Sequence, residues 1–142
     1  MQSLEESFML IALEEAKKAL PLDVPIGAII TDSNNKIISK AYNLREKNQS
    51  SLDHAEIIAI KQACQILQNW RLDNCKIYIT LEPCLMCTGA IIESRISTVI
   101  FGAYNDLSPT SNFLIKKDIK VYGGILEKNC LNILKSFFSS KR

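Results

Sequence analysis

The sequence predicts an α/β protein whose sheet contains both antiparallel and parallel strands. Two observations carry this prediction: two short β-prone segments joined by a polar turn, and two later β-prone segments separated by a helix. The first two segments are expected to form an antiparallel hairpin, whereas strands joined through a helix lie parallel. A length of 142 residues, of which 47% are hydrophobic, suits one domain with a single core over residues 1–142.

The first half of the chain predicts one helix and the hairpin. Ser3 followed by Glu6 matches a capping box, and apolar residues recur at helical spacing beyond it. Gly27 lies inside an expected strand, where it indicates either a bulge or a close approach of the backbone to a ligand. The expected elements are a helix from Ser3 to about Leu20 and strands over 26–31 and 36–42.

The second half predicts the helices that would carry a site. A polar loop over 43–53 leads to a helix that begins at His54 and is apolar on more than one side, so we expect other elements to cover it. The polar segment over 103–118 fits no element clearly. The other expected elements are strands over 76–81, 98–102 and 119–122 and helices from about Pro83 to Ser94 and from Leu126 to Phe138.

Charge, hydropathy and cysteine content narrow the functional classes. The net charge of +2 is too small to indicate a nucleic-acid partner by itself. No apolar run approaches the roughly 20 residues of a membrane span, and the first residues lack the layout of a signal peptide. The five cysteines are an odd number, and Cys64, Cys75 and Cys130 fall in apolar surroundings that suit reduced thiols. We therefore expect a cytoplasmic protein without disulfides.

Two short motifs predict a metal site. Cys84 and Cys87 lie on one face of the first turn of a helix, where free N–H groups and the helix dipole favour thiolates. Zinc prefers such ligands, and a catalytic zinc keeps three protein ligands and an open position for water, so His54 is the expected third ligand. Glu56 is then left to move protons to and from the water. This H-x-E…P-C-x-x-C pattern is typical of zinc deaminases that act on nucleobases.

A Cys-x-x-Cys motif also has more common interpretations. It can be a redox pair or half of a structural zinc site. A closed structural site would need a fourth ligand from Cys64, Cys75 or Cys130, and neither interpretation uses Glu56. The two motifs at the starts of two predicted helices favour a catalytic zinc.

Beyond the zinc motif, the sequence resembles the bacterial tRNA adenosine deaminases, the TadA family, over nearly its whole length. The likeness rests on His54-Ala-Glu56, Thr80-Leu-Glu-Pro-Cys-Leu-Met-Cys-Thr-Gly-Ala-Ile91, Phe101-Gly-Ala103 and the closing Phe137-Phe138 with basic residues. It implies a cytidine-deaminase-like three-layer α/β/α fold with a mixed five-stranded sheet, a homodimer, and one Zn²⁺ per chain. It also implies hydrolytic deamination of adenosine to inosine at the wobble position of a tRNA anticodon. A zinc-dependent deaminase of a free base or nucleoside, such as cytosine or guanine, remains the alternative.

The resemblance also implies roles for single residues. His54, Cys84 and Cys87 match the zinc ligands of the family, and Glu56 matches its proton shuttle. Asn43 matches a base-contacting asparagine, with a turn residue that ends a strand as the alternative. The implied substrate-binding residues are Ile26, Asn43 and Ala55, and the implied RNA contacts are Arg45, Asn105, Phe138, Lys141 and Arg142. For the last three, the alternative is a docked helix with a frayed tail.

One segment departs from the family pattern. Family members commonly have an Asp at the position of Asn105 and then a Lys-x-Gly stretch. This chain has a shorter segment without glycine, from Tyr104 to Asn112. The departure leaves open how strictly RNA is preferred over DNA, and it does not affect the zinc chemistry.

Overall fold

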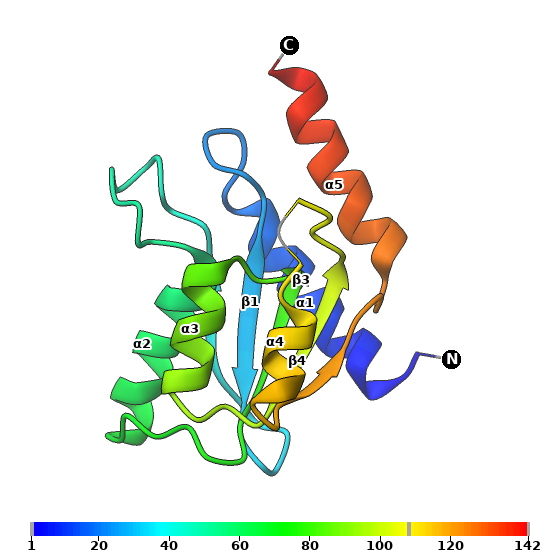
Figure 1. The fold of residues 1–142 in the computed structure, drawn as a ribbon. Coiled ribbons are helices and arrows are strands. Elements are labelled where there is room, and N and C mark those ends of the chain that lie inside the picture. Colours follow the sequence, from blue (N-terminus) through cyan, green and yellow to red (C-terminus); the bar gives the residue numbers. More distant parts are fainter. Residues whose placement is uncertain (1, 108, 142) are drawn as a thin grey trace.

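The computed structural model describes residues 2–107 and 109–141 and contains a five-stranded sheet with helices on both faces (Figure 1). The strands are β1 (Gly27–Thr31), β2 (Ile37–Tyr42), β3 (Lys76–Leu81), β4 (Thr98–Ala103) and β5 (Lys120–Tyr122). Their order in the sheet is β2-β1-β3-β4-β5. β1 pairs antiparallel with β2 and β3, whereas β4 pairs parallel with β3 and β5. The predicted hairpin, the parallel crossover and the mixed five-stranded sheet are confirmed.

Each face of the sheet has its own hydrophobic cluster. The helices are α1 (Leu4–Lys17), α2 (Ala55–Leu67), α3 (Leu85–Glu93), α4 (Ser111–Lys116) and α5 (Glu127–Ser140). Successive strand side chains point to opposite faces, so Ile29 and Tyr78 pack with residues of α1 and α5, whereas Ile30 and Ile77 pack with residues of α2, α3 and α4. The three-layer α/β/α arrangement is therefore confirmed.

The observed elements differ from the sequence predictions at the end of α1 and in the segment between β4 and β5. The capping box is present, with Glu6 N–H donating to Ser3 Oγ at 3.1 Å, but α1 ends at Lys17, and turns rather than helix follow it through Leu22. The polar segment that fitted no element contains the short helix α4. Among the described residues, no helix has the length and apolar character that a membrane span needs.

Gly27 permits close packing of α1 on β1. A Cβ atom at this position would collide with the carbonyl oxygen of Ala12 in α1. The register irregularity between β1 and β2 lies instead between Ile30 and Thr31. The predicted bulge at Gly27 is therefore wrong, and the close neighbour that the structure shows is a helix backbone. Close approach of the backbone to a ligand stays a prediction.

One edge of the sheet gathers the segments that matter for function. β2, β3 and β4 all run in the same direction, because β2 and β3 are both antiparallel to β1 and β4 is parallel to β3. The connections that follow these strands, including the starts of α2 and α3, therefore leave from the same edge (Figure 1). In α/β sheets this is where ligands bind.

Candidate metal centre and active site

The starts of α2 and α3 bring three candidate metal ligands together. His54 is the N-cap of α2, Cys84 is the N-cap of α3, and Cys87 lies in the first turn of α3. Their ligand atoms all lie within 4.8 Å of one another. The His54 Nδ1 atom lies 3.6 Å from Cys84 Sγ and 3.5 Å from Cys87 Sγ. The structure therefore groups the three residues that the sequence predicted.

The local backbone differs from the prediction at Pro83. We expected α3 to begin at about Pro83, but it begins at Leu85, so the proline precedes the N-cap. Cys84 keeps an extended backbone, with ψ at 175°, and therefore leads into the helix rather than forming its first turn. Its sulfur still reaches the same centre as that of Cys87, which is inside the helix.

The distances from the histidine nitrogen to the two sulfurs fit zinc. Zn–S bonds of about 2.3 Å and Zn–N bonds of about 2.0–2.1 Å in a tetrahedron place sulfur and nitrogen about 3.6 Å apart. The two His54 Nδ1 to sulfur distances, 3.6 and 3.5 Å, agree with this value. The donor set of one imidazole and two thiols is also the set that zinc prefers.

The two thiols need a cation if both are to ionise. The hydrogen bond from the Cys87 side chain is the main cause that lowers the pKa of Cys84 to about 5. The same contact, with burial, raises the pKa of Cys87. The pair by itself therefore accommodates one negative charge. A divalent ion would compensate the second charge, and its binding would release the proton of Cys87.

Glu56 lies in the first turn of α2, beside the metal ligands, and is only 4% exposed. Burial is the main cause that raises the pKa of this carboxyl to about 7, and the neighbouring Cys84 acts in the same direction. A group with a pKa near neutrality both accepts and returns protons readily. The position and environment of Glu56 therefore suit acid–base chemistry at the metal centre.

A closed structural zinc site is not supported. The metal-binding group found in the described residues has three members, and it includes none of Cys64, Cys75 and Cys130. These cysteines are free thiols elsewhere in the fold. Three protein ligands leave one coordination position open, as in catalytic zinc sites.

The predicted substrate-binding residues lie around the start of α2. Ala55 is the first residue of α2 and is fully buried. Asn43, which follows β2, is 6% exposed and bridges two connections: its side-chain amide donates to the Val24 carbonyl at 3.2 Å, and its side-chain oxygen accepts from Arg45 N–H at 3.1 Å. Its backbone N–H donates to the Ile26 carbonyl at 3.0 Å. Asn43 therefore ends a strand and fixes the loop that leads to His54.

The structure also gathers three of the predicted RNA contacts. Arg45, Phe138 and Lys141 line one open hollow of about 460 Å³ between the end of α5 and the loops after α1 and β2. Phe138 is 53% exposed, and the Lys141 ammonium lies 5.2 Å from the centre of the Phe137 ring. Asn105 lies in the β4–α4 connection instead, and Arg142 lies outside the described residues.

Sequence reasoning missed two buried carboxylates that fix the loops at this edge. Asp23 accepts hydrogen bonds from the backbone N–H groups of Glu46 and Lys47, at 2.6 and 3.1 Å. Glu82 accepts hydrogen bonds from Asn105, Thr110 and Ser111. Glu82 lies between a predicted strand and Pro83, and this position could have indicated that its carboxylate is buried and fixes a loop. Asp23 offered no such signal, because its partners are 23 and 24 residues away.

The fold and the metal site together indicate a zinc-binding deaminase, and comparisons with known proteins agree with this class. Residues 2–103 match the family model described as the cytidine and deoxycytidylate deaminase zinc-binding region. A guanine deaminase from Nitrosomonas europaea has a structure with a TM-score of 0.86, 23% identity, and coverage of 94% of this chain and 84% of its own, which shows a shared fold alone.

Closer relatives narrow the class. The tRNA-specific adenosine deaminase of Bacillus subtilis is 41% identical over 147 residues, which cover 97% of this chain and 91% of the relative. A structure from a study of A-to-I editing by tRNA:A34 deaminases at the wobble position of transfer RNA has a TM-score of 0.84 and 33% identity, and covers 90% of this chain and 99% of its own. The chain therefore belongs to the tRNA-specific adenosine deaminases, within the zinc-binding deaminase family.

Proposed function

We propose that this protein hydrolyses adenosine to inosine at the wobble position of a tRNA anticodon. The observation that carries the proposal is the group formed by His54, Cys84, Cys87 and buried Glu56, in a chain that matches tRNA-specific adenosine deaminases along nearly all of its length. The alternative, a deaminase of free bases, has weaker support, because the guanine deaminase shares the fold at only 23% identity.

The zinc-binding residues follow from the geometry. His54, Cys84 and Cys87 would hold one Zn²⁺ per chain, with Nδ1 as the histidine ligand atom. When bound, the ion would act as a Lewis acid that activates a water for attack on the purine carbon bearing the amino group.

Glu56 would carry the proton transfers. It would take the first proton of the attacking water and give it to the ring nitrogen, and then take the second proton and give it to the departing amine, which leaves as ammonia. The reaction consumes one water for each adenosine. Because Glu56 is buried, its carboxylate is shielded from bulk solvent and its contacts with the substrate are strengthened.

The substrate would enter at the edge of the sheet where the ligands lie. Ile26, Asn43 and Ala55 would contact the adenine base. Arg45, Phe138, Lys141, Arg142 and Asn105 would contact the rest of the loop, since exposed aromatic and cationic side chains suit unstacked bases and phosphates. The target nucleotide must leave the loop stack to reach the metal.

We further propose that residues 1–142 form a single domain that acts as a cytoplasmic homodimer through the outer face of α2 and α3. Ile66 and Leu85 on these helices are 66% and 71% exposed. Gly89 lies within α3, and a Cβ atom there would meet nothing within 4 Å outside its own helix backbone. A glycine inside a helix lowers stability by about 1 kcal/mol relative to alanine. Close approach of a second chain to α3 would explain why a glycine is present there. The proposed cytoplasmic location follows from the proposed substrate, because the protein would encounter tRNA in the cytoplasm.

One experiment tests the activity. The purified protein would be incubated with an anticodon stem-loop that carries adenosine at the wobble position and, separately, with free adenosine, guanine and cytosine. We expect inosine in the stem-loop and much slower release of ammonia from the free compounds. Rapid turnover of a free base with an unchanged stem-loop would refute the proposal.

A further inference from the structure

Glu82 is a buried carboxylate whose hydrogen-bond partners all lie in one segment. It follows β3, precedes Pro83, and is 2% exposed. It accepts from the backbone N–H groups of Asn105 and Thr110 (both 3.0 Å), and from the backbone N–H (3.1 Å) and hydroxyl (2.6 Å) of Ser111. None of the ion pairs found in the described residues includes Glu82. These hydrogen bonds are therefore what compensates its charge.

A second contact joins the same segment to the backbone beside a metal ligand. The Thr110 hydroxyl donates to the Pro83 carbonyl oxygen at 2.7 Å, and Pro83 directly precedes Cys84. The Glu82 backbone N–H also donates to the Ala103 carbonyl at 2.8 Å. The segment 104–111 is therefore held at both of its ends by the turn that leads into the metal-binding helix.

The sheet places this segment beside the metal centre. β3 and β4 are parallel, and Leu81 pairs with Ala103 at their carboxyl ends. Figure 1 shows the β4–α4 connection at the same edge of the sheet as the start of α3. Between its fixed ends the connection presents Tyr104 and Leu107 to solvent, with exposed fractions of 47% and 98%. It therefore offers exposed contact surface at the edge of the sheet where the metal ligands lie.

We propose that Glu82 is a positioning residue that holds Asn105, Thr110 and Ser111, at the two ends of the β4–α4 connection, in place as one wall of the RNA-binding site. Its carboxylate suits this role, because an ionised group accepts several N–H bonds more strongly than a neutral one. A segment that is ordered before binding loses less entropy when the RNA loop arrives. Glu82 acts through this segment and not on the reacting atoms. The inference rests on the RNA substrate proposed above.

The test is the variant Glu82→Gln, which keeps the size of the side chain but replaces one acceptor oxygen by an NH₂ donor. We expect the KM for the anticodon stem-loop to rise about tenfold or more, because charged hydrogen bonds are lost, and kcat to fall by less than about threefold. Glu82→Asp, which keeps the charge, should raise KM less than Glu82→Gln does. Zinc content should remain that of the wild type.

Glu15→Gln provides a matched control. Glu15 is also a buried carboxylate, 5% exposed, but it lies in α1 and pairs with Lys18 at 2.6 Å. Its substitution should leave the KM for the stem-loop unchanged. A rise of KM in both variants would attribute the effect to general destabilisation and overturn the proposal.

Amide hydrogen exchange over 105–111 provides a measurement that needs no RNA activity. We expect faster exchange in Glu82→Gln than in the wild type or Glu15→Gln, because three backbone N–H groups lose a charged acceptor. Unchanged exchange, or faster exchange with an unchanged KM, would overturn the proposal. Equal losses of zinc and kcat would show that Glu82 supports Cys84 instead. A wild-type protein that leaves the stem-loop unmodified would refute the proposed function separately, while exchange still reports on Glu82.

Discussion

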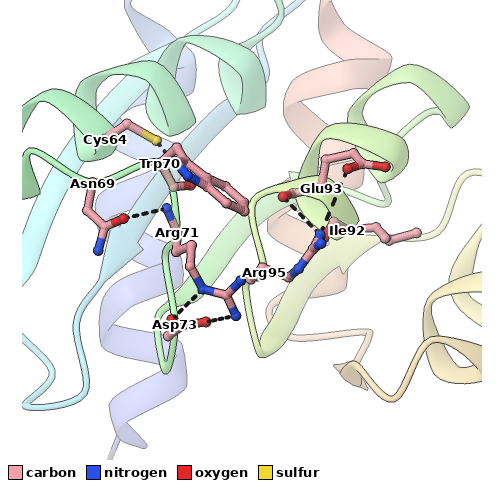
Figure 2. A network of polar contacts seen from close by, with 8 residues as sticks. All are labelled: Cys64, Asn69, Trp70, Arg71, Asp73, Ile92, Glu93 and Arg95. Atoms are coloured by element: carbon pink, nitrogen blue, oxygen red, sulfur yellow. Dashed lines mark hydrogen bonds and ion pairs between the residues drawn. The ribbon is translucent and has the colours of Figure 1, made fainter.

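The two ends of the α2–α3 helix pair carry different polar groups: candidate metal ligands at the N-terminal ends and two arginines at the C-terminal ends. At their N-terminal ends, His54, Cys84 and Cys87 direct ligand atoms at one another. Just beyond their C-terminal ends, two arginines lie near the ring of Trp70 (Figure 2), with the guanidinium carbons of Arg71 and Arg95 at 5.4 and 5.6 Å from the centre of the ring.

The arginines at the second end have partners within the protein. Arg71 donates to the Asp73 carboxylate at 3.0 and 3.3 Å, and Arg95 donates to the carbonyls of Ile92 and Glu93 at 3.2 and 3.1 Å. A cation at the C-terminal end of a helix is also favoured by the helix dipole. At the metal end, by contrast, two thiols and the Glu56 carboxyl share a small space and a cation is needed to ionise them together. A cluster of polar groups therefore indicates a site when its charges are not balanced inside the chain.

The largest expected effect comes from breaking the metal end. His54→Ala removes one of three ligands, so we expect zinc to be lost and turnover of the stem-loop to fall below detection. Zinc content by elemental analysis and inosine formation would be measured together. The same substitution should lower thermal stability, because bound metal stabilises the folded state. An active, zinc-loaded His54→Ala protein would show that the metal has other ligands.

The next effect separates chemistry from metal binding at the same end. Glu56→Gln keeps the shape of the side chain and removes the base, so zinc should be retained while turnover falls by at least about a hundredfold. Single-turnover deamination of the stem-loop would measure the chemical step directly. Near-normal turnover would show that another group moves the proton.

A smaller effect is expected at the hollow beside α5, which tests whether cations there have an external partner. Deleting residues 139–142 removes Lys141 and Arg142, so RNA affinity should fall. The slope of log affinity against log salt should become shallower by about one for each lost phosphate contact. Binding titrations at several salt concentrations would measure both. If affinity and slope survive the deletion, these residues are a frayed tail.

The sequence predicted most of the fold and the whole metal group because these depend on local signals. The capping box of α1, the strand over 76–81 and the spacing of Cys84 and Cys87 at the start of a helix are each encoded within a few residues. The ligands come from two motifs about 30 residues apart, and the parallel pairing of β3 and β4 required only that a helix connect them.

The sequence did not predict features that depend on distant partners. α4 is six residues long and has no side-chain cap, and its segment is held by Glu82, which directly follows β3. The packing of Gly27 against Ala12 likewise joins two elements whose contact no periodicity reveals. Asp23 and Glu82 are single residues in turns, and their roles became visible only when the loops they bind were placed beside them.

The smallest effect on activity is expected at the opposite end of the helix pair. Trp70→Ala removes the ring that both arginines contact, so unfolding free energy should fall by about 1–2 kcal/mol, the sum of two exposed cation–π contacts. Trp70→Phe should lose less, because a ring remains. Urea denaturation would measure the loss, and zinc content and the KM for the stem-loop should match the wild type, since the charges there are balanced internally. A raised KM in Trp70→Ala with normal stability would mean that the Trp70 surface contacts the substrate, and internal charge balance would then fail to distinguish the two ends.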